Sequence, residues 1–143
     1  MPAPWRSARA AISAPRDPKQ KNPARVTRGR ANYVSGLRAE TLAALWLWLR
    51  FYRIVGRRVK TRSGEIDLIA RRGGVLVFVE VKARADFDAA AESLGAHQQA
   101  RLARAADLYV AARPALQALD MRFDVILITP RHLPRHIIDA WRP

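Results

Sequence analysis

Four side chains that could act together on a substrate fall within two short neighbouring stretches of the sequence: Glu65, Asp67, Glu80 and Lys82. The stretches, 64–70 and 77–82, are rich in β-branched and aromatic residues, and this composition predicts two strands. Gly73 and Gly74 lie between them and predict a tight hairpin turn. The two strands would therefore bring three acids and one lysine into a single corner of a sheet.

The register of this hairpin predicts which side chains face each other. If the two glycines are the turn residues, Asp67 is expected directly opposite Glu80. By the same register, Glu65 is expected directly opposite Lys82. Opposed residues share one face of a sheet, so these side chains would lie together. The other face, from Ile66 onward, is wholly apolar and is predicted to be core.

Two facing carboxylates at a separation of roughly 5 Å repel by about 3 kcal/mol at an effective dielectric of about 20. A bound cation, a raised carboxyl pKa or the neighbouring lysine would have to offset this repulsion. Carboxylate oxygens suit a hard divalent ion such as Mg²⁺. The alternative is a solvated edge hairpin, in which the acids and the lysine form ordinary cross-strand pairs.

A further acid, Glu40, lies in a segment that predicts a helix from Ser35 to about Ile54. The middle of this segment is apolar nearly all round, so the helix should be buried on more than one side. A glutamate on such a face needs a partner. Glu40 would either approach the acidic corner or reach solvent near the positive end of the helix.

The remaining elements follow from the same patterns. Residues 53–61 predict a basic strand in which Gly56 marks a bulge, and residues 83–91 predict a loop. The later elements are a helix, 92–113, and two strands, 121–129 and 136–141. This order predicts an α/β fold with one mixed sheet flanked by helices. The hairpin should be central in the sheet, because it contains a continuous apolar run.

Composition limits the classes of function. The chain has 143 residues, enough for one domain, and no cysteine, which excludes disulfides, thiolate zinc sites and cysteine nucleophiles. Its net charge of +14 favours a polyanionic partner, nucleic acid first and an anionic membrane surface second. No apolar run is long enough to span a bilayer and no secretory signal is visible, so we expect a cytoplasmic protein.

Half of the net charge lies in the first 31 residues, which hold five prolines, eight basic residues and one acid. This composition predicts a disordered basic tail, with the folded domain at 32–143. The tail would either grip phosphates or have no role. A transit peptide is disfavoured, because the prolines would interrupt an amphipathic helix.

The motifs also resemble a known family, the YraN-type uncharacterised proteins. The residues that carry the resemblance are Glu40, Gly-Glu-Ile-Asp-Leu-Ile at 64–69, Phe-Val-Glu-Val-Lys at 78–82 and Arg-Phe-Asp-Val at 122–125. The similarity covers roughly residues 33–140. That family in turn resembles the PD-(D/E)XK, restriction-endonuclease-like nucleases, which include archaeal Holliday junction resolvases. The resemblance implies a restriction-endonuclease-like fold and a connection to DNA repair or recombination.

The resemblance also implies roles for individual residues. Asp67 matches the metal-binding aspartate, Glu80 and Lys82 match the E-x-K pair, and Glu40 matches the first-helix acid. Gln98 stands where many relatives have a lysine, although related nucleases place a glutamine in that helix. In a second departure from the family pattern, Arg57-Arg58 replaces an asparagine common before the hairpin.

The leading hypothesis is a metal-dependent nuclease that hydrolyses nucleic acid, with DNA favoured over RNA. Mg²⁺ or Mn²⁺ would bind Asp67, Glu80 and Glu40, and Lys82 would orient water or stabilise charge on the phosphate. Six residues would contact the nucleic acid: Arg57, Arg58, Lys60, Arg62, Arg84 and Gln98.

Two alternatives remain open. One is a non-catalytic nucleic-acid-binding module, and the other is an adaptor with exposed tryptophan anchors at Trp46, Trp48 or Trp141. A homodimer would suit a junction substrate, although nothing in the sequence requires one.

Overall fold

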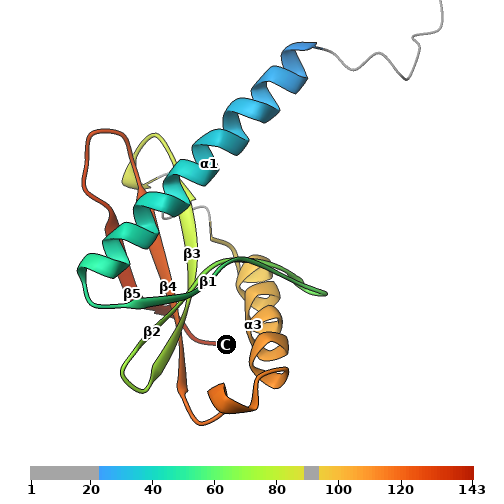
Figure 1. Ribbon diagram of the computed structural model, residues 1–143. Helices are drawn as coiled ribbons and strands as arrows, with labels where there is room; N and C mark the ends of the chain where they lie inside the picture. The colour runs from blue at the N-terminus through green and yellow to red at the C-terminus, as the bar shows by residue number, and fades with distance from the viewer. Residues whose placement is uncertain (1–22, 89–93) are drawn as a thin grey trace, which may run out of the picture.

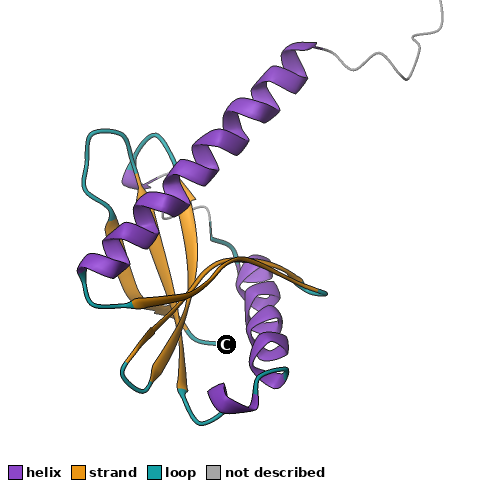
Figure 2. Ribbon diagram, in the orientation of Figure 1, coloured by secondary structure: helices purple, strands orange, loops and turns teal. Residues whose placement is uncertain are grey.

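A computed structural model of the chain describes residues 23–88 and 94–143. One five-stranded sheet, in the order β1-β2-β3-β4-β5, lies between helices α1 and α3 (Figures 1 and 2). The elements are α1 (Pro23–Leu49), β1 (Arg53–Thr61), β2 (Gly64–Arg72), β3 (Val75–Ala83), α3 (Ala96–Ala111), the 3₁₀ helix η1 (Pro114–Leu116), β4 (Asp120–Ile128) and β5 (Arg135–Trp141). The predicted single α/β domain with a mixed sheet is confirmed.

The sheet is mixed because one of its connections crosses over. Strands β1, β2 and β3 pair antiparallel, β3 pairs parallel with β4 through the crossover that contains α3, and β4 pairs antiparallel with β5. The hairpin turn at Gly73 and Gly74 has the predicted register, with Arg72 opposite Val75. The predicted bulge is also present, since the pairing of β1 with β2 shifts between Ile54 and Gly56. Strand β3 is central, as its apolar sequence predicted.

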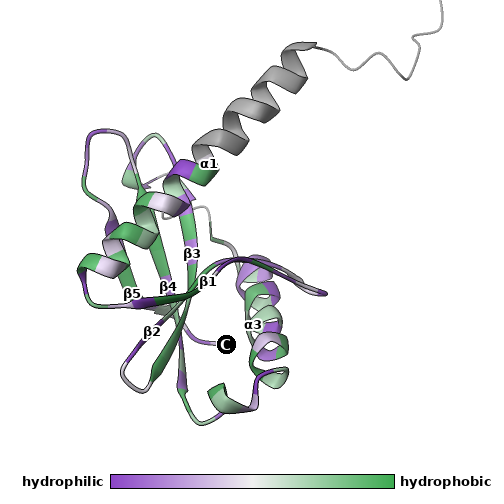
Figure 3. Cartoon of the chain, viewed as in Figure 1, coloured by the Kyte–Doolittle hydropathy of each residue, from purple (hydrophilic) through white to green (hydrophobic). Residues whose placement is uncertain are grey.

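Each face of the sheet carries its own apolar layer. Under α1, the aliphatic side chains of β2 and β3 pack against Ala43 and Leu47. Under α3, Phe78 stacks on Phe123 and contacts Tyr109 edge-on. Figure 3 shows hydrophobic residues in green along much of β3 and β4. On the hairpin, Ile69 and Phe78 pack in the layer under α3, so its charged side chains are confined to one corner.

The first helix differs from its predicted bounds at both ends. It begins at Pro23 rather than near Ser35, and it ends at Leu49 rather than near Ile54. Proline is tolerated in a first turn, where no intrahelical bond to its nitrogen is needed. At the other end, Phe51 takes a left-handed backbone (φ 69°), which cannot continue a helix. Residues 23–31 of the predicted tail are therefore helical, and residues 1–22 lie outside the described part of the chain.

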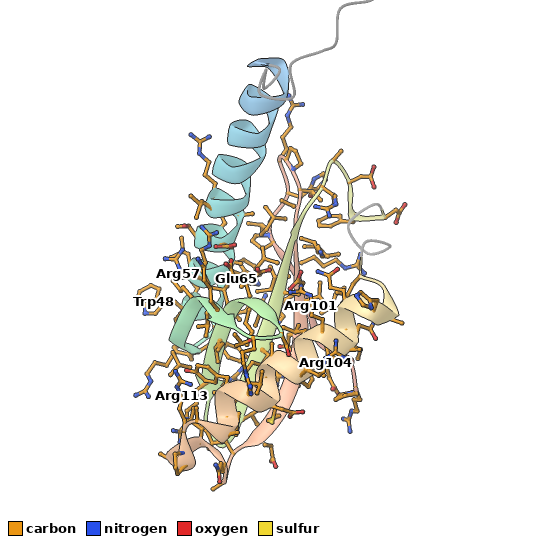
Figure 4. The ribbon with its side chains drawn as sticks, turned by 90° about the vertical axis from the view of Figure 1, so that its right-hand side faces the viewer. Trp48, Arg57, Glu65, Arg101, Arg104 and Arg113 are labelled. Atoms are coloured by element: carbon orange, nitrogen blue, oxygen red, sulfur yellow. The ribbon has the colours of Figure 1, made fainter. Side chains whose placement is uncertain are left out.

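The outer face of α1 is exposed, which corrects the prediction that this helix is buried on several sides. Only the side with Ala39, Ala43 and Leu47 packs on the sheet. Apolar side chains remain at the surface along the rest of the helix and just after its end: Leu42, Leu45, Trp48, Leu49 and Phe51. Trp48 is 65% exposed, and Figure 4 shows it pointing away from the sheet. No helix in the described residues is both long and apolar enough to cross a membrane.

A buried charge network ties β4 to β5. Asp124 is fully buried and accepts hydrogen bonds from the Arg122 guanidinium (2.8 and 2.7 Å) and from the Asp139 backbone N–H (2.9 Å). Its Oδ2 also lies 2.7 Å from His136 Nε2. The hydroxyl of Tyr52 accepts a further bond from Arg122. Burial alone would raise the pKa of Asp124, but the bonds from His136 and Arg122 outweigh it and hold the pKa below its usual range.

Candidate active site

The chain is irregular at Asp67, and this irregularity shapes the site. Regular pairing of β2 with β3 ends at Leu68–Val79, one pair short of the predicted Asp67–Glu80 pair. The Asp67 carboxylate instead accepts a hydrogen bond from the Val81 backbone N–H (2.8 Å). On the other side of β2, pairing with β1 skips Arg58, whose backbone is left-handed (φ 49°).

The break at Asp67 reverses the alternation of the strand. Leu68 packs in the layer under α1, whereas Ile66 packs in the layer under α3. In a regular strand the two would share a face, as the sequence predicted. The predicted pairing of Glu65 with Lys82 is also wrong, because the pairing of β2 with β3 ends before Glu65, whose strand partner is Lys60 on β1.

The structure nonetheless brings the three predicted acidic ligands together. Glu40 from α1, Asp67 from β2 and Glu80 from β3 line one hollow of about 430 Å³. Glu40 and Glu80 are buried. A fourth acid joins them, because carboxylate oxygens of Glu40, Glu65 and Asp67 lie within 4.8 Å of one another. The acids from two neighbouring strands and one helix thus converge across the break in β2.

The lysine and the glutamine form the other half of the site. Lys82 Nζ lies 3.2 Å from Glu80 Oε1 and donates a hydrogen bond to Gln98 Oε1 (3.2 Å). Gln98 Nε2 in turn donates to Glu80 Oε1 (2.5 Å). Helix α3 therefore orients both members of the E-x-K pair through Gln98. The predicted contact of Gln98 with nucleic acid stays a prediction.

The sequence placed Glu65 in the charged corner but gave it no role as a ligand, and it gave Arg58 no acidic partner. Arg58 Nε lies 3.2 Å from Glu65 Oε1 and 3.7 Å from Glu40 Oε2, so this arginine offsets part of the acidic charge. The usable signal was the run of basic residues on the strand that precedes three acids. It did not show that Arg58 would face inward, because that orientation depends on its left-handed backbone.

The other predicted nucleic-acid contacts divide into near and far groups. Arg84 lines the acidic hollow, and Arg57 donates a hydrogen bond to the Thr41 hydroxyl of α1 (3.0 Å). Lys60 and Arg62 lie near the end of the β1–β2 hairpin, which crosses α3 in Figure 1, and they line a separate hollow with Arg113. Neither Lys60 nor Arg62 lines the acidic hollow, although Lys60 is the strand partner of Glu65.

The electrostatics of the hollow fit a cation. Burial and the nearby charge of Glu80 raise the pKa of Asp67 to about 7, against the opposing bond from Val81. Burial also raises the pKa of Glu40, although Arg58 opposes the shift. One carboxylate oxygen each of Glu40 and Glu80 is buried with no hydrogen-bond partner among the described residues. Oxygens of this kind are the ligands that Mg²⁺ and Mn²⁺ take, so the donor set fits such an ion.

Comparison with known proteins places this geometry in a family. The model of the uncharacterised protein family UPF0102 matches residues 39–128, which include Glu40, Asp67, Glu80 and Lys82. The chain belongs to the UPF0102 family. This is the YraN-type family that the strand motifs resemble, within the PD-(D/E)XK-like nuclease superfamily, so that resemblance is confirmed.

Curated UPF0102 relatives align over most of the chain. The UPF0102 protein of Parvibaculum lavamentivorans is 57% identical over 130 residues, covering 91% of this chain and 96% of the relative. The UPF0102 protein of Paramagnetospirillum magneticum is 51% identical, covering 73% of this chain and 84% of the relative. The UPF0102 protein of a Bradyrhizobium species is 46% identical, covering 90% of this chain and 88% of the relative. The family thus extends over the acidic hollow and both helices.

The raised pKa of Asp67 predicts a pH effect on the stability of this UPF0102 protein without metal. The folded-state pKa, about 7, lies above the ordinary value of 3.8, so the folded protein binds more protons between these limits. Stability contributed by protonated Asp67 is therefore present at low pH and lost as pH rises towards 7. In EDTA, we expect Asp67→Asn to be more stable than wild type by a few kcal/mol at pH 8, and much less so at pH 5. Urea unfolding at both pH values measures this difference, and an equal difference at the two would contradict it.

Proposed function

We propose that this protein is a metal-dependent nuclease that hydrolyses phosphodiester bonds of nucleic acid, with DNA favoured over RNA. The observation that supports this most strongly is the shared hollow of Glu40, Asp67 and Glu80, with Lys82 held 3.2 Å from Glu80. Buried acids that repel one another destabilise the fold, and a cation would relieve that cost. An arginine at the rim, Arg84, adds a positive group where a phosphate would enter.

Each residue has a distinct task in this proposal. Asp67, Glu80 and Glu40 would hold Mg²⁺ or Mn²⁺, which when bound polarises a phosphate and lowers the pKa of a water molecule. Lys82 places an ammonium group beside the metal ligands, where it stabilises the negative charge that develops on the phosphate. Gln98 keeps the Lys82 and Glu80 side chains in fixed orientations. Arg58 lowers the net charge of the acids when no ion is bound.

Metal titration tests the binding half of the proposal. Calorimetry with Mn²⁺ should show uptake by wild type and no uptake by Asp67→Asn, because the amide removes the charge but keeps the side-chain shape. Asp139→Asn serves as the matched control. Asp139 pairs with exposed Arg142 and lines a different hollow, so this variant should leave Mn²⁺ uptake unchanged.

The catalytic half is tested on labelled single strands, flaps, junctions and RNA with Mg²⁺ or Mn²⁺. Cleavage that EDTA and Asp67→Asn both abolish supports the nuclease. Metal uptake without cleavage of any of these substrates would favour the non-catalytic nucleic-acid-binding module.

One observation favours a second candidate, an adaptor that docks on another protein. The outer face of α1 exposes Leu45 and Trp48, and Phe51, just after the helix, is 86% exposed. Exposed apolar groups that include a tryptophan are typical of protein-interaction sites. By contrast, Trp141 is buried and cannot serve as the predicted anchor. An adaptor without catalysis would keep its partner binding in Asp67→Asn and lose it in Trp48→Ala.

A further inference from the structure

A second hollow adjoins the acidic one. It has a volume of about 790 Å³, and the two hollows share Ala39, Ala83 and Arg84 as lining residues. Its walls come from α1, from the segment after β3 and from the loop between β4 and β5. Figure 1 shows these two connections at the same end of the sheet, beside α1. A polymer bound at the acids could therefore continue directly into this second hollow.

The charge of the second hollow is opposite to that of the first. Arg38, Arg84 and Arg131 line it from three different segments, together with His132. None of the described residues that line it is acidic. Basic groups that line a groove attract the phosphates of a nucleic-acid backbone. The charge thus favours a polyanion that runs away from the acids.

The second hollow is also apolar, which a groove for phosphates alone would not require. Leu42 of α1 faces Pro130, Leu133 and Pro134 of the β4–β5 loop across it, and Leu133 is 75% exposed. In a duplex the faces of the bases are covered by their neighbours, whereas an unpaired strand presents them to a protein surface. Flat ring faces gain free energy by packing on apolar and aromatic side chains.

An unsatisfied hydroxyl provides an independent indication of a ligand. Thr129 lines the hollow, is only 5% exposed, and its Oγ1 has no hydrogen-bond partner among the described residues. A buried hydroxyl without a partner costs free energy, so native structures usually provide one. A ligand with phosphate or base oxygens in the hollow would supply the missing acceptor.

The loop that forms the far wall is held in place. His132 Nδ1 lies 2.9 Å from the Pro130 carbonyl oxygen, to which it can donate, and the His132 ring contacts Phe87 edge-on at 5.3 Å between centroids. The Arg135 guanidinium lies over the same Phe87 ring. The His132 ring is therefore positioned before any ligand arrives, and this preorganisation lowers the entropic cost of binding.

We propose that the second hollow binds an unpaired strand of nucleic acid that continues from the acidic site. This inference rests on the proposed nuclease function and narrows it to substrates with a single-stranded segment, such as flaps or frayed ends. Arg38 and Arg131 contact successive phosphates, the Thr129 hydroxyl donates to an oxygen of the strand, and a base packs against His132 and Leu133. A continuous duplex lacks the exposed base faces that this surface accommodates.

Fluorescence anisotropy on the full chain in EDTA tests the groove without any cleavage. The probes are a fluorescein-labelled 15-nucleotide single strand and a blunt duplex of the same sequence. Wild type should bind the single strand more tightly than the duplex. The double variant Arg38→Ala/Arg131→Ala should bind the single strand at least tenfold more weakly than wild type. The same double change should lower the slope of log Kd against log salt by about 1.4, because each single-strand phosphate contact contributes about 0.7. His132→Ala should cost about fivefold or more through lost stacking.

The controls separate the groove from general charge and from the nuclease proposal. Arg104→Ala removes one exposed arginine of α3, across the sheet from the hollow, and should leave single-strand affinity within twofold. The basic N-terminal residues are unchanged in every variant, so their contribution cancels. The proposed strand-binding role of the second hollow would be contradicted by equal wild-type affinities for the single strand and the duplex. It would also be contradicted if Arg104→Ala lost as much single-strand affinity as the double variant. If no substrate is cleaved in the presence of metal, the proposed nuclease function is contradicted, but the proposed binding of a single strand is not.

Discussion

Lys82→Met is expected to slow metal-dependent cleavage by a factor of about 10² to 10³, the effect of removing one preorganised donor from a developing oxyanion. The side chain is buried, and its ammonium is held by Glu80 and Gln98. Methionine keeps the length and the packing of the lysine stem, so the fold should persist. Single-turnover cleavage of a flap substrate at saturating Mn²⁺ measures the rate of the chemical step.

The same variant distinguishes a catalytic lysine from a structural one. Mn²⁺ uptake by Lys82→Met should be retained, because Asp67, Glu80 and Glu40 are untouched. Gln98→Ala should lower the rate less, since Gln98 acts only by orienting the two charged groups. Cleavage by Lys82→Met at the wild-type rate would contradict the assigned role, and loss of both cleavage and metal uptake would indicate that Lys82 supports the acids instead.

Asp124→Ala is expected to give the largest loss of stability, about 3–5 kcal/mol of unfolding free energy. The substitution leaves the Arg122 guanidinium and the His136 ring without their shared acceptor in the interior. In a chain of this size, such a loss lowers the melting temperature by about 10 °C or more. Urea unfolding at pH 7 measures it directly.

Two comparisons make the Asp124 result specific. Asp139→Asn changes an acid paired with exposed Arg142 and keeps a residue type that tolerates its left-handed backbone (φ 52°), so it should cost less than about 1 kcal/mol. The pKa of Asp124 is lowered, so its contribution is present above the ordinary value of 3.8 and is lost as pH falls below it. An Asp124→Ala deficit that stays unchanged from pH 7 to pH 3 would contradict this explanation.

The two buried aspartates show how environment separates function from stability. Asp67 lies on β2 and Asp124 on β4, on either side of the central strand β3, and burial disfavours the charged form of both. Asp124 has the cationic Arg122 as a direct partner, and its pKa falls. Asp67 faces Glu80 and other acids, and its pKa rises. The cationic partner of Asp124 stabilises the folded chain by itself, whereas the acids around Asp67 favour a bound cation.

Much of the architecture was determined by local sequence. The alternating and continuous apolar runs predicted β1 with its bulge, the Gly73–Gly74 hairpin and the position of the final strands within a residue. These features are readable because strand periodicity and turn chemistry depend on residues close together in the chain. The acids at 40, 67 and 80 and the lysine at 82 were identified in the same way, from residue type and the spacing of two strands.

The tertiary structure decided what local patterns do not encode. The reversal of β2 at Asp67 lies opposite the left-handed backbone of Arg58 on β1. There the Asp67 side chain bonds to the Val81 N–H, where the sequence predicted a regular pair. The start of α1 at Pro23 and the exposure of its outer face follow from which side packs on the sheet. Asp124, quoted in the motif without a role, acquired one through its burial and its bonds to Arg122 and to His136 on the adjacent strand β5. Residue types and local spacing fixed which groups were available, but burial and long-range contacts set their charge states and partners, because the cost of removing a charge from water depends on the whole surrounding fold.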